Sequence, residues 1–269
     1  MDMELTYIYH SGFALSGDGF TVIMDYYRDS EDGQAQSDLN RLMDGTFSNQ
    51  EAGMPEGIVH SELLRRPGKL YVLASHFHPD HFNKEVLQWR EQRPDIIYIF
   101  SKDILRHRRA QKEDAVWLKK GEEYKDETLS VRAFGSTDVG VSFLLQAGGK
   151  KIFHAGDLNN WHWMDESTEA EWKGAEKNFL HELDDLYAYT PEVDVAMFPV
   201  DPRLGKEYMR GAGQFVTKIK THIFVPMHFT PEYAKANAFC DFAEAHGVRF
   251  VSLTHRGQKI AVSYTHLRA

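Results

Sequence analysis

The sequence contains a single cysteine, Cys240, so no disulfide can form within the chain. Its start also lacks a basic segment followed by an apolar stretch, the pattern typical of a secretory signal. The strongly apolar stretches, such as DIIYIF at 95–100 and HIFVPM at 222–227, fall far short of the ~20 residues that a membrane-spanning helix needs. These absences predict a soluble, cytoplasmic protein that does not enter a membrane.

A surplus of basic residues is absent as well. The chain has 31 Lys and Arg against 40 Asp and Glu, a formal net charge of -9. This balance disfavours a surface for long polyanions, so we expect a small-molecule substrate rather than nucleic acid. The basic run RHRR at 106–109 has no interleaved aromatic residues that could stack on bases, and it is interpreted as a solvated helix face.

Internal repeats and linkers rich in proline or serine are also missing. With 269 residues, of which 42% are hydrophobic, the chain predicts one domain over 1–269 with a large core. Residues 28–68 are polar and are predicted to form an insertion of the kind that often covers a site. Residues 263–269 have the character of a disordered or vector-derived tail. The oligomeric state stays open, with a homo-oligomer as one option.

Strand-like and helix-like segments alternate along the chain. Two β-rich segments at 4–27 are joined by a Gly-Asp-Gly turn, as in a hairpin. A strand-helix-strand order follows, then a second β meander at 129–156 and a long polar helix at 170–186. The remaining predicted elements are a strand at 193–200, a helix at 207–220, a strand at 222–229, a helix at 233–247 and a strand at 249–253. The pattern favours an α/β fold.

Three histidines and an aspartate stand within six positions of the stretch LASHFHPDHF, residues 73–82. They lie between the predicted strand KLYVLAS and the helix that starts near Asn83, on a loop of the kind where sheet proteins place chemistry. Imidazole and carboxylate suit zinc, iron or manganese. The alternative is a surface loop that is rich in histidine by chance. It is disfavoured because four residues that can bind a metal stand within six positions. These residues are His76, His78, Asp80 and His81.

The spacing His-Phe-His-Pro-Asp-His at 76–81 matches the HxHxDH signature of the metallo-β-lactamase superfamily, which the chain resembles over essentially its whole length. The segments YIYHSGFAL and VIMDYY are similar to the branch that contains the ascorbate-phosphate lactonase-like hydrolases and the N-acylphosphatidylethanolamine phospholipase-like enzymes. The resemblance implies a four-layer αββα sandwich that holds two divalent ions at one sheet edge, zinc first, with manganese or iron as alternatives.

The same resemblance assigns the ligands. His76 and His78 would hold the first ion, at a position called site 1 below. Asp80 and His81 would hold the second, at site 2. Asp157 in IFHAGDLN would bridge both ions, and His228 at the end of FVPMHF would complete site 2. A Gly-Asp turn after a strand is common, and His228 has a core histidine as its alternative, but their order behind the first motif favours ligands.

One ligand of the family pattern is missing. The third site 1 histidine would fall in VRAFGSTDVGVSF, which contains none, and Ser136, Thr137 or Asp138 stands near its place. His154 is an alternative that would reach in from the neighbouring strand or instead pack inside the sandwich. We therefore expect site 1 to bind its ion more weakly than site 2, or the protein to work with one ion.

The resemblance implies a metal-dependent hydrolase in which metal-activated water attacks a small, anionic ester, lactone or phosphoester. Asp80 would orient that water and move its protons. His10 and Asp25 would lie near the metal face, where they would support the metal ligands or contact the substrate. Substrate contacts are expected from His10, from the aromatic walls Trp161 and Trp163, and from Arg203. Two other classes stay open: an RNA or DNA phosphodiesterase of the same superfamily, and an iron-binding redox protein that uses the same site.

Overall fold

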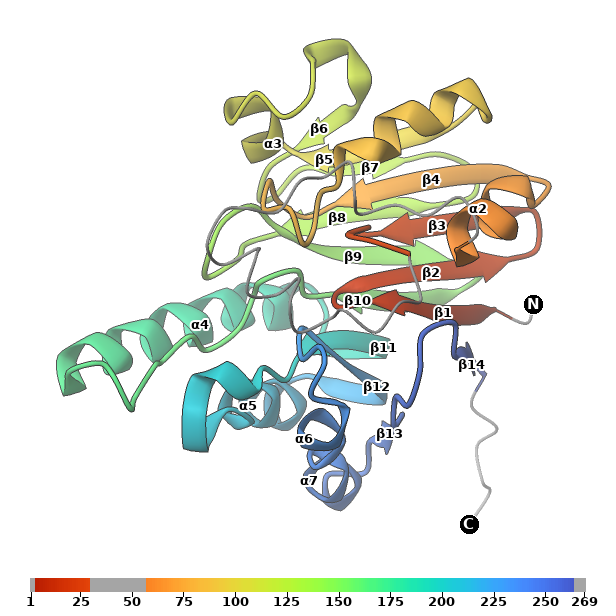
Figure 1. The fold of residues 1–269 in the computed structure, drawn as a ribbon. Coiled ribbons are helices and arrows are strands. Elements are labelled where there is room, and N and C mark those ends of the chain that lie inside the picture. The colour runs from red at the N-terminus through yellow and green to blue at the C-terminus, as the bar shows by residue number, and fades with distance from the viewer. Residues whose placement is uncertain (1–2, 30–56, 264–269) are drawn as a thin grey trace.

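Two seven-stranded β-sheets form the centre of the protein (Figure 1), within residues 3–29 and 57–263, the part of the chain that the computed structural model describes. The first sheet has the strand order β14 (Lys259–Ala261), β1 (Glu4–Tyr9), β2 (Gly12–Gly17), β3 (Phe20–Met24), β4 (Lys69–Ala74), β5 (Ile97–Ser101), β6 (Val116–Leu118). The second has the order β13 (Arg249–Phe250), β12 (Lys220–Met227), β11 (Glu192–Pro199), β10 (Lys150–His154), β9 (Ser142–Ala147), β8 (Ser130–Phe134), β7 (Glu123–Lys125).

Strand β4 shows why the sheets stack. Its side chains alternate between two hydrophobic cores, because successive residues of a strand point to opposite faces. Tyr71 and Leu73 belong to the core that lies between the sheets, whereas Leu70 and Val72 belong to the core on the outer face of the first sheet. A strand that is apolar on both faces has to be covered on both, which a four-layer arrangement provides.

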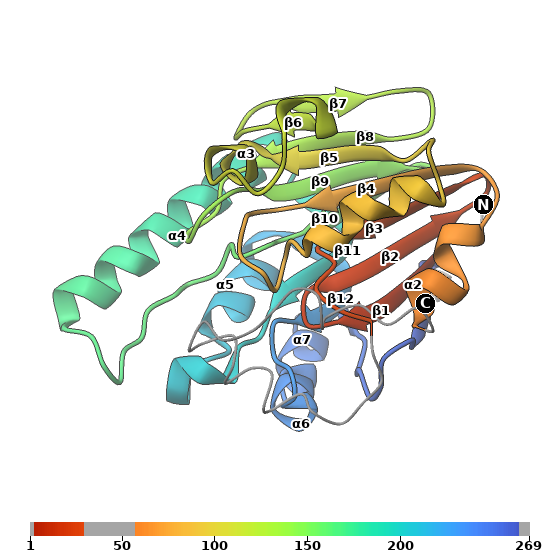
Figure 2. The ribbon, with the colours of Figure 1, turned by 45° about the horizontal axis from the view of Figure 1, so that its top comes forward.

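Helices cover the two outer faces (Figure 2). The first sheet carries short ones: α2 (Ile58–Ser61), η2 (Leu63–Arg65), η3 (Lys84–Glu91), α3 (Lys102–Arg106) and η4 (Lys112–Asp114). The second sheet is covered by α4 (Glu169–Tyr189), α5 (Arg210–Lys218), α6 (Tyr233–Asn237) and α7 (Cys240–Ala245), and η5 (Pro202–Glu207) follows β11. Helix α4 begins with a capping box between Thr168 and Glu171. None of the described helices is long and apolar enough to cross a membrane.

The predicted αββα sandwich is confirmed, and the local differences have physical reasons. The helix predicted at 233–247 is two helices, α6 and α7, separated at Ala238 and Phe239. The helix predicted near Asn83 is a 3₁₀ helix. Strands β6, β7 and β14 were not predicted, since each has three residues and carries little alternation. Most of the predicted insertion, residues 30–56, and residues 264–269 of the tail lie outside the described residues.

The topology brings distant parts of the sequence to one edge. Strands β3, β4 and β5 run parallel in the first sheet, and β10, β11 and β12 run parallel in the second. The carboxyl ends of parallel strands meet at the same edge, which is where open sheets place their ligands. Five of the loops that carry the predicted site residues follow β1, β4, β10, β11 and β12.

Candidate metal centre

Four imidazole and carboxylate groups converge on one point at this edge and form what we call the site 2 cluster: His10, Asp80, His81 and His228. One ligand atom from each lies within 4.8 Å of the others. Asp80 Oδ2 is 3.4 Å from His10 Nε2 and 3.8 Å from both His81 Nε2 and His228 Nε2. The three imidazoles are buried. His10, which the sequence placed among substrate contacts, therefore lies within the ligand cluster.

A second group of the same kind, the site 1 cluster, consists of His76, His78, Asp138 and Asp157. His76 Nε2 lies 3.1 Å from His78 Nδ1 and 3.3 Å from Asp157 Oδ2. Asp138 Oδ2 lies 3.5 Å from His78 Nδ1. This cluster is more open, since 36% of the His78 side chain and 43% of the Asp138 side chain are exposed.

Asp157 joins the two clusters. Its Oδ2 faces His76 in site 1, while its Oδ1 lies 3.0 Å from His81 Nε2 and 3.3 Å from His228 Nε2 in site 2. A carboxylate that turns one oxygen to each cluster has the geometry needed to bridge two ions. Asp157 thus lies between the two clusters, and its role as a bridging ligand stays a prediction.

Asp25 orients histidines of both clusters. Its Oδ2 accepts hydrogen bonds from His81 Nδ1 at 2.7 Å and from Ser75 Oγ at 2.6 Å, and its Oδ1 accepts one from Ser75 N at 2.7 Å. Ser75 Oγ in turn lies 3.0 Å from His76 Nδ1. Because the Nδ1 atoms are directed to these oxygens, the Nε2 atoms of His76 and His81 point into the clusters. Such support from behind fixes the tautomer and orientation of a metal-binding histidine.

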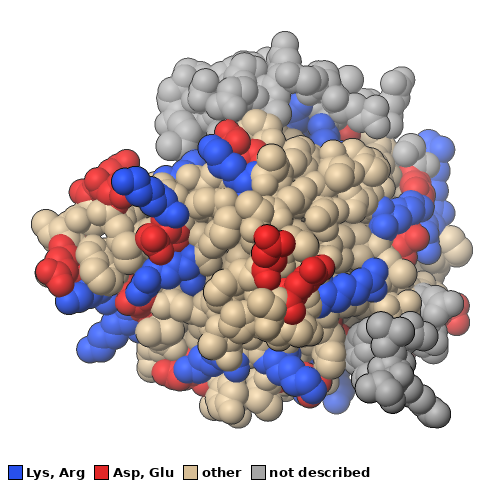
Figure 3. All heavy atoms as spheres, turned by 90° about the horizontal axis from the view of Figure 1, so that it is seen from below, with Lys and Arg blue, Asp and Glu red and all other residues tan. Residues whose placement is uncertain are grey.

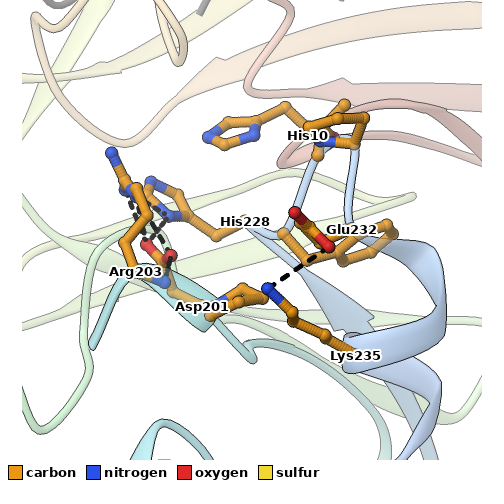
Figure 4. A pocket seen from close by; sticks show the side chains of 10 residues that line it. His10, Asp201, Arg203, His228, Glu232 and Lys235 are labelled. Atoms are coloured by element: carbon orange, nitrogen blue, oxygen red, sulfur yellow. Dashed lines mark hydrogen bonds and ion pairs between the residues drawn. The ribbon is translucent and has the colours of Figure 1, made fainter. Parts of the chain in front are cut away.

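Asp201 supports His228 in the same way and was not found from the sequence. Its Oδ2 lies 2.9 Å from His228 Nδ1, and the same oxygen accepts a 2.6 Å hydrogen bond from Arg203 Nη2 (Figure 4). Arg203 Nε also lies 3.0 Å from each carboxylate oxygen. The pKa of Asp201, which burial would raise, is held below its usual value by His228 and Arg203. An ionised Asp201 keeps the His228 Nε2 lone pair directed at site 2.

The charge states of His10, Asp80 and Asp157 suit cation binding. Burial, reinforced by the neighbouring His228, lowers the pKa of His10 to about 4, so its ring is neutral at pH 7. Burial would also raise the pKa values of Asp80 and Asp157, but the facing imidazoles, His81 first, hold both well below the usual value. Neutral imidazoles and ionised carboxylates are the forms that coordinate metals.

Unsatisfied atoms provide a direct test of whether these residues fit an ion. Among the described residues, four buried atoms at the clusters make no hydrogen bond of good geometry: His10 Nε2, His81 Nε2, His228 Nε2 and Asp157 Oδ1, although His81 Nε2 and Asp157 Oδ1 face each other at 3.0 Å. A buried polar atom without a partner costs about 1–3 kcal/mol, and four around one point are not explained by folding. A divalent cation would satisfy all of them, so the donor set fits a metal.

The backbone is strained where three of these loops begin. His10, Asp25 and His228 have φ values of 57°, 46° and 62°. Each directly follows a strand, β1, β3 or β12. Non-glycine residues in this region cost on the order of 1 kcal/mol or more and persist mainly at functional sites. The sharp exits turn the three side chains toward the common edge.

His154 requires a correction as the candidate ligand of site 1. Its Nε2 donates to Ser11 O at 2.8 Å, and its Nδ1 accepts from Gly156 N at 3.2 Å. Both ring nitrogens are used within the protein, and the residue lies in neither cluster. The β10 register turns this side chain into the sandwich, as the packing alternative held. Asp138 instead belongs to the site 1 cluster.

The clusters open into a cavity of about 460 Å³ that is lined by His78, Asp80, Asp138 and Asp157 together with the predicted substrate residues Trp161, Trp163 and Arg203. The two indoles stack, with ring centroids 6.4 Å apart and an angle of 16° between planes. Trp161 Nε1 donates to Asp157 O at 2.8 Å, which fixes this wall to the bridging residue. A smaller cavity of about 200 Å³ adjoins Arg203 and His228 and is lined by His10, Glu232 and Lys235 (Figure 4).

A family model described as the beta-lactamase superfamily domain matches residues 4–176. The chain therefore belongs to this family, as the HxHxDH resemblance implied. No curated protein matches it.

Solved structures agree on the fold. The metallo hydrolase Igni18 from Ignicoccus hospitalis is 17% identical, with a TM-score of 0.64 over 98% of this chain and 100% of that one. An isothiocyanate hydrolase from Delia radicum gut bacteria is 14% identical, with a TM-score of 0.52 over 96% and 98%. CmlA, a diiron β-hydroxylase from Streptomyces venezuelae, is 14% identical, with a TM-score of 0.59 over 97% of this chain and 53% of that one. At these identities the similarity establishes the shared fold alone.

Proposed function

We propose that the protein is a metal-dependent hydrolase of a small, anionic ester, lactone or phosphoester. The observation that carries the proposal is Asp157, which turns one oxygen to each of two ligand clusters at the floor of a cavity. Divalent ions held by these residues would supply Lewis acidity and activate a water molecule for attack at neutral pH.

The residues around the clusters divide the remaining tasks. Asp80 is ionised, lines the cavity and belongs to site 2, so it is the side chain that we expect to orient the attacking water and take up its proton. Trp161 and Trp163 offer a flat apolar wall for a ring or acyl group. The cavity of about 460 Å³ has the size of a small-molecule site.

The position of Arg203 favours the proposal that the substrate is anionic. Its guanidinium lines both cavities and is held against Asp201 by hydrogen bonds to both carboxylate oxygens. A fixed cation beside a cavity attracts a carboxylate or phosphate. On the face shown in Figure 3, the described acidic and basic side chains are interspersed rather than gathered into a continuous basic tract. This distribution, with the net charge of -9, favours a small anion over a nucleic acid.

The test is hydrolysis of phosphodiester, phosphomonoester, lactone and thioester panels by the metal-loaded protein. On the best substrate, Arg203→Ala should raise KM more than it lowers kcat, as expected for lost ground-state binding. Equal KM values for the two proteins on an anionic substrate would remove Arg203 from the proposal. Absence of hydrolysis with zinc, manganese and iron across all panels would contradict the proposed function.

The iron-binding redox alternative rests on one observation, the carboxylate of Asp138 in site 1, because oxygen ligands suit iron better than zinc. A visible absorption spectrum of the protein as isolated, combined with metal analysis, separates the two classes. Zinc without visible bands would favour hydrolysis, and stoichiometric iron with redox-dependent bands would favour the alternative.

A further inference from the structure

The loop between β8 and β9 is fastened on both sides to loops that carry metal-binding residues. At one end, Val141 N donates to Ser75 O at 3.0 Å. Gly140 has a φ of 75°, and a Cβ there would lie 2.4 Å from His76 Cβ, so only glycine permits this close approach. The loop therefore packs directly against the backbone that presents His76.

The other side of the loop is tied to the segment after Asp157. Thr137 Oγ1 donates to Asn159 O at 2.5 Å and accepts from Asn159 N at 2.9 Å. Asp138 stands between these two attachments, and its amide donates to Ser136 Oγ at 3.4 Å. An exposed side chain in an untethered loop would have no fixed direction, but here the backbone position of Asp138 is determined by the ligand loops themselves.

The Asp138 carboxylate faces His78 at a separation that leaves room between them. The distance from Oδ2 to His78 Nδ1 is 3.5 Å, which is too long for a good hydrogen bond. His76 Nε2 and the second oxygen of Asp157 close the same space. Four donors from three separate loops, with one ligand atom each lying within 4.8 Å of the others, form a tetradentate arrangement.

We propose that Asp138 is a metal ligand in place of the missing histidine, and that site 1, with two imidazoles and two carboxylates, discriminates less against manganese and ferrous iron than a three-histidine site would. Carboxylates favour these harder ions relative to zinc, whereas imidazole favours zinc. The inference rests on the proposed two-ion centre and adds the identity of its fourth site 1 ligand, beside His76, His78 and Asp157. It also predicts different ion preferences at the two sites, since site 2 contains three imidazoles.

The experiment uses the full-length chain, stripped of metal and then titrated with Zn²⁺ or Mn²⁺ by calorimetry, with bound metal counted by mass spectrometry. The variants are Asp138→Ala and Asp138→His. The matched control is Asp18→His, because Asp18 is exposed in the turn between β2 and β3, at the opposite end of strands that lead to the site. Circular dichroism checks that each variant is folded.

We expect the wild-type chain to bind two ions. Asp138→Ala should weaken only the weaker step, by more than the about 10–100-fold that loss of a supporting outer residue costs. Asp138→His should raise the preference of that step for zinc over manganese by about tenfold or more. Asp18→His should leave both steps unchanged.

The outcomes that overturn the inference are distinct from those that overturn the function. Unchanged affinity of both steps in Asp138→Ala would show that Asp138 is not a ligand, with the two-ion centre intact. A lost step in Asp138→Ala combined with an unchanged zinc preference in Asp138→His would overturn the claim about selectivity. A wild-type chain that binds neither ion would contradict the proposed function itself.

Discussion

The two clusters at the sheet edge share Asp157 but differ in burial and in their support. Site 2 is closed: His10, His81 and His228 are buried, and Asp25 and Asp201 hold two of the three rings from behind. Site 1 contains a half-exposed histidine and a half-exposed aspartate, His78 and Asp138, and only His76 is supported, through Ser75. Rigid, satisfied ligands bind more tightly than mobile ones. For the proposed two-ion centre, this difference predicts a permanent ion at site 2 and an exchangeable ion at site 1.

The largest effect is expected where the clusters meet. Asp157→Ala removes a carboxylate that faces both clusters, so binding of both ions should be lost or greatly weakened. Hydrolysis should fall by about 10³-fold or more, since the metal supplies several kcal/mol of transition-state stabilisation. Metal counting and kinetics measure this, with Asp18→Ala as the control. Retention of both ions in Asp157→Ala would show that Asp157 is not a ligand that the two sites share.

Variants of the two aspartates that support the ligand histidines should distinguish the two sites. Asp25→Asn should weaken both binding steps by about 10–100-fold, because Asp25 bonds His81 directly and His76 through Ser75. Asp201→Asn should weaken only the tighter step by a similar factor, because Asp201 contacts His228 alone among the histidines of the clusters. Calorimetric titration of both variants gives the two constants. A pattern in which Asp201→Asn affects the weaker step would mean that tight and weak ions are assigned to the wrong clusters.

His154 tests whether a buried histidine beside the centre contributes to metal binding. His154→Ala removes hydrogen bonds to Ser11 O and Gly156 N inside the sandwich, which should cost about 2–3 kcal/mol of unfolding free energy. The metal content should stay at the wild-type value. Thermal unfolding and metal counting are compared with His181→Ala, an exposed histidine on α4. Loss of an ion without loss of stability in His154→Ala would show that His154 is a site 1 ligand.

Proton release gives a smaller distinction. Burial would lower the pKa of His81, but Asp157 and Asp80 raise it well above its usual value, which favours a proton on this ring in the metal-free protein. An ion at site 2 must displace that proton, so the affinity of site 2 for the ion should fall by about tenfold per pH unit below the pKa of His81.

In site 1, burial and His76 lower the pKa of His78, which has no proton to release at pH 7. Titrations in buffers of different ionisation enthalpy should show about one proton released at the tighter step. Zero proton release there would contradict the assignment.

The sequence was sufficient where spacing alone sets geometry. Residues 76–81 follow one buried strand, so the HxHxDH spacing by itself directs their side chains to the sheet edge. Asp157 and His228 were assigned through the family resemblance and their order behind the first motif, and in the structure each follows a parallel strand that ends at the same edge. The order of the predicted elements favoured an α/β fold, and the family resemblance implied the four-layer sandwich.

Contacts between distant segments could not be predicted. Asp201 appears in the sequence as an ordinary aspartate before a proline, and only the packing of β11 beside β12 brings it to His228. His10 was assigned to the substrate because a single histidine after a strand gives no sign of its depth. The choice between Asp138 and His154 depended on side-chain direction, which the register of β10 and the attachments of the β8–β9 loop determine.

The most direct test is stepwise removal of metal from the wild-type protein loaded with two ions. A chelator is added in small amounts at constant pH, and bound metal and hydrolysis are measured after each addition. We expect one ion to leave at least tenfold more readily than the other, and hydrolysis to fall as that first ion leaves. The reason is that the site 1 cluster, in which His78 and Asp138 are half-exposed, should bind its ion more weakly than the buried site 2 cluster. Release of both ions together with equal affinity would contradict the division into an exchangeable and a permanent site.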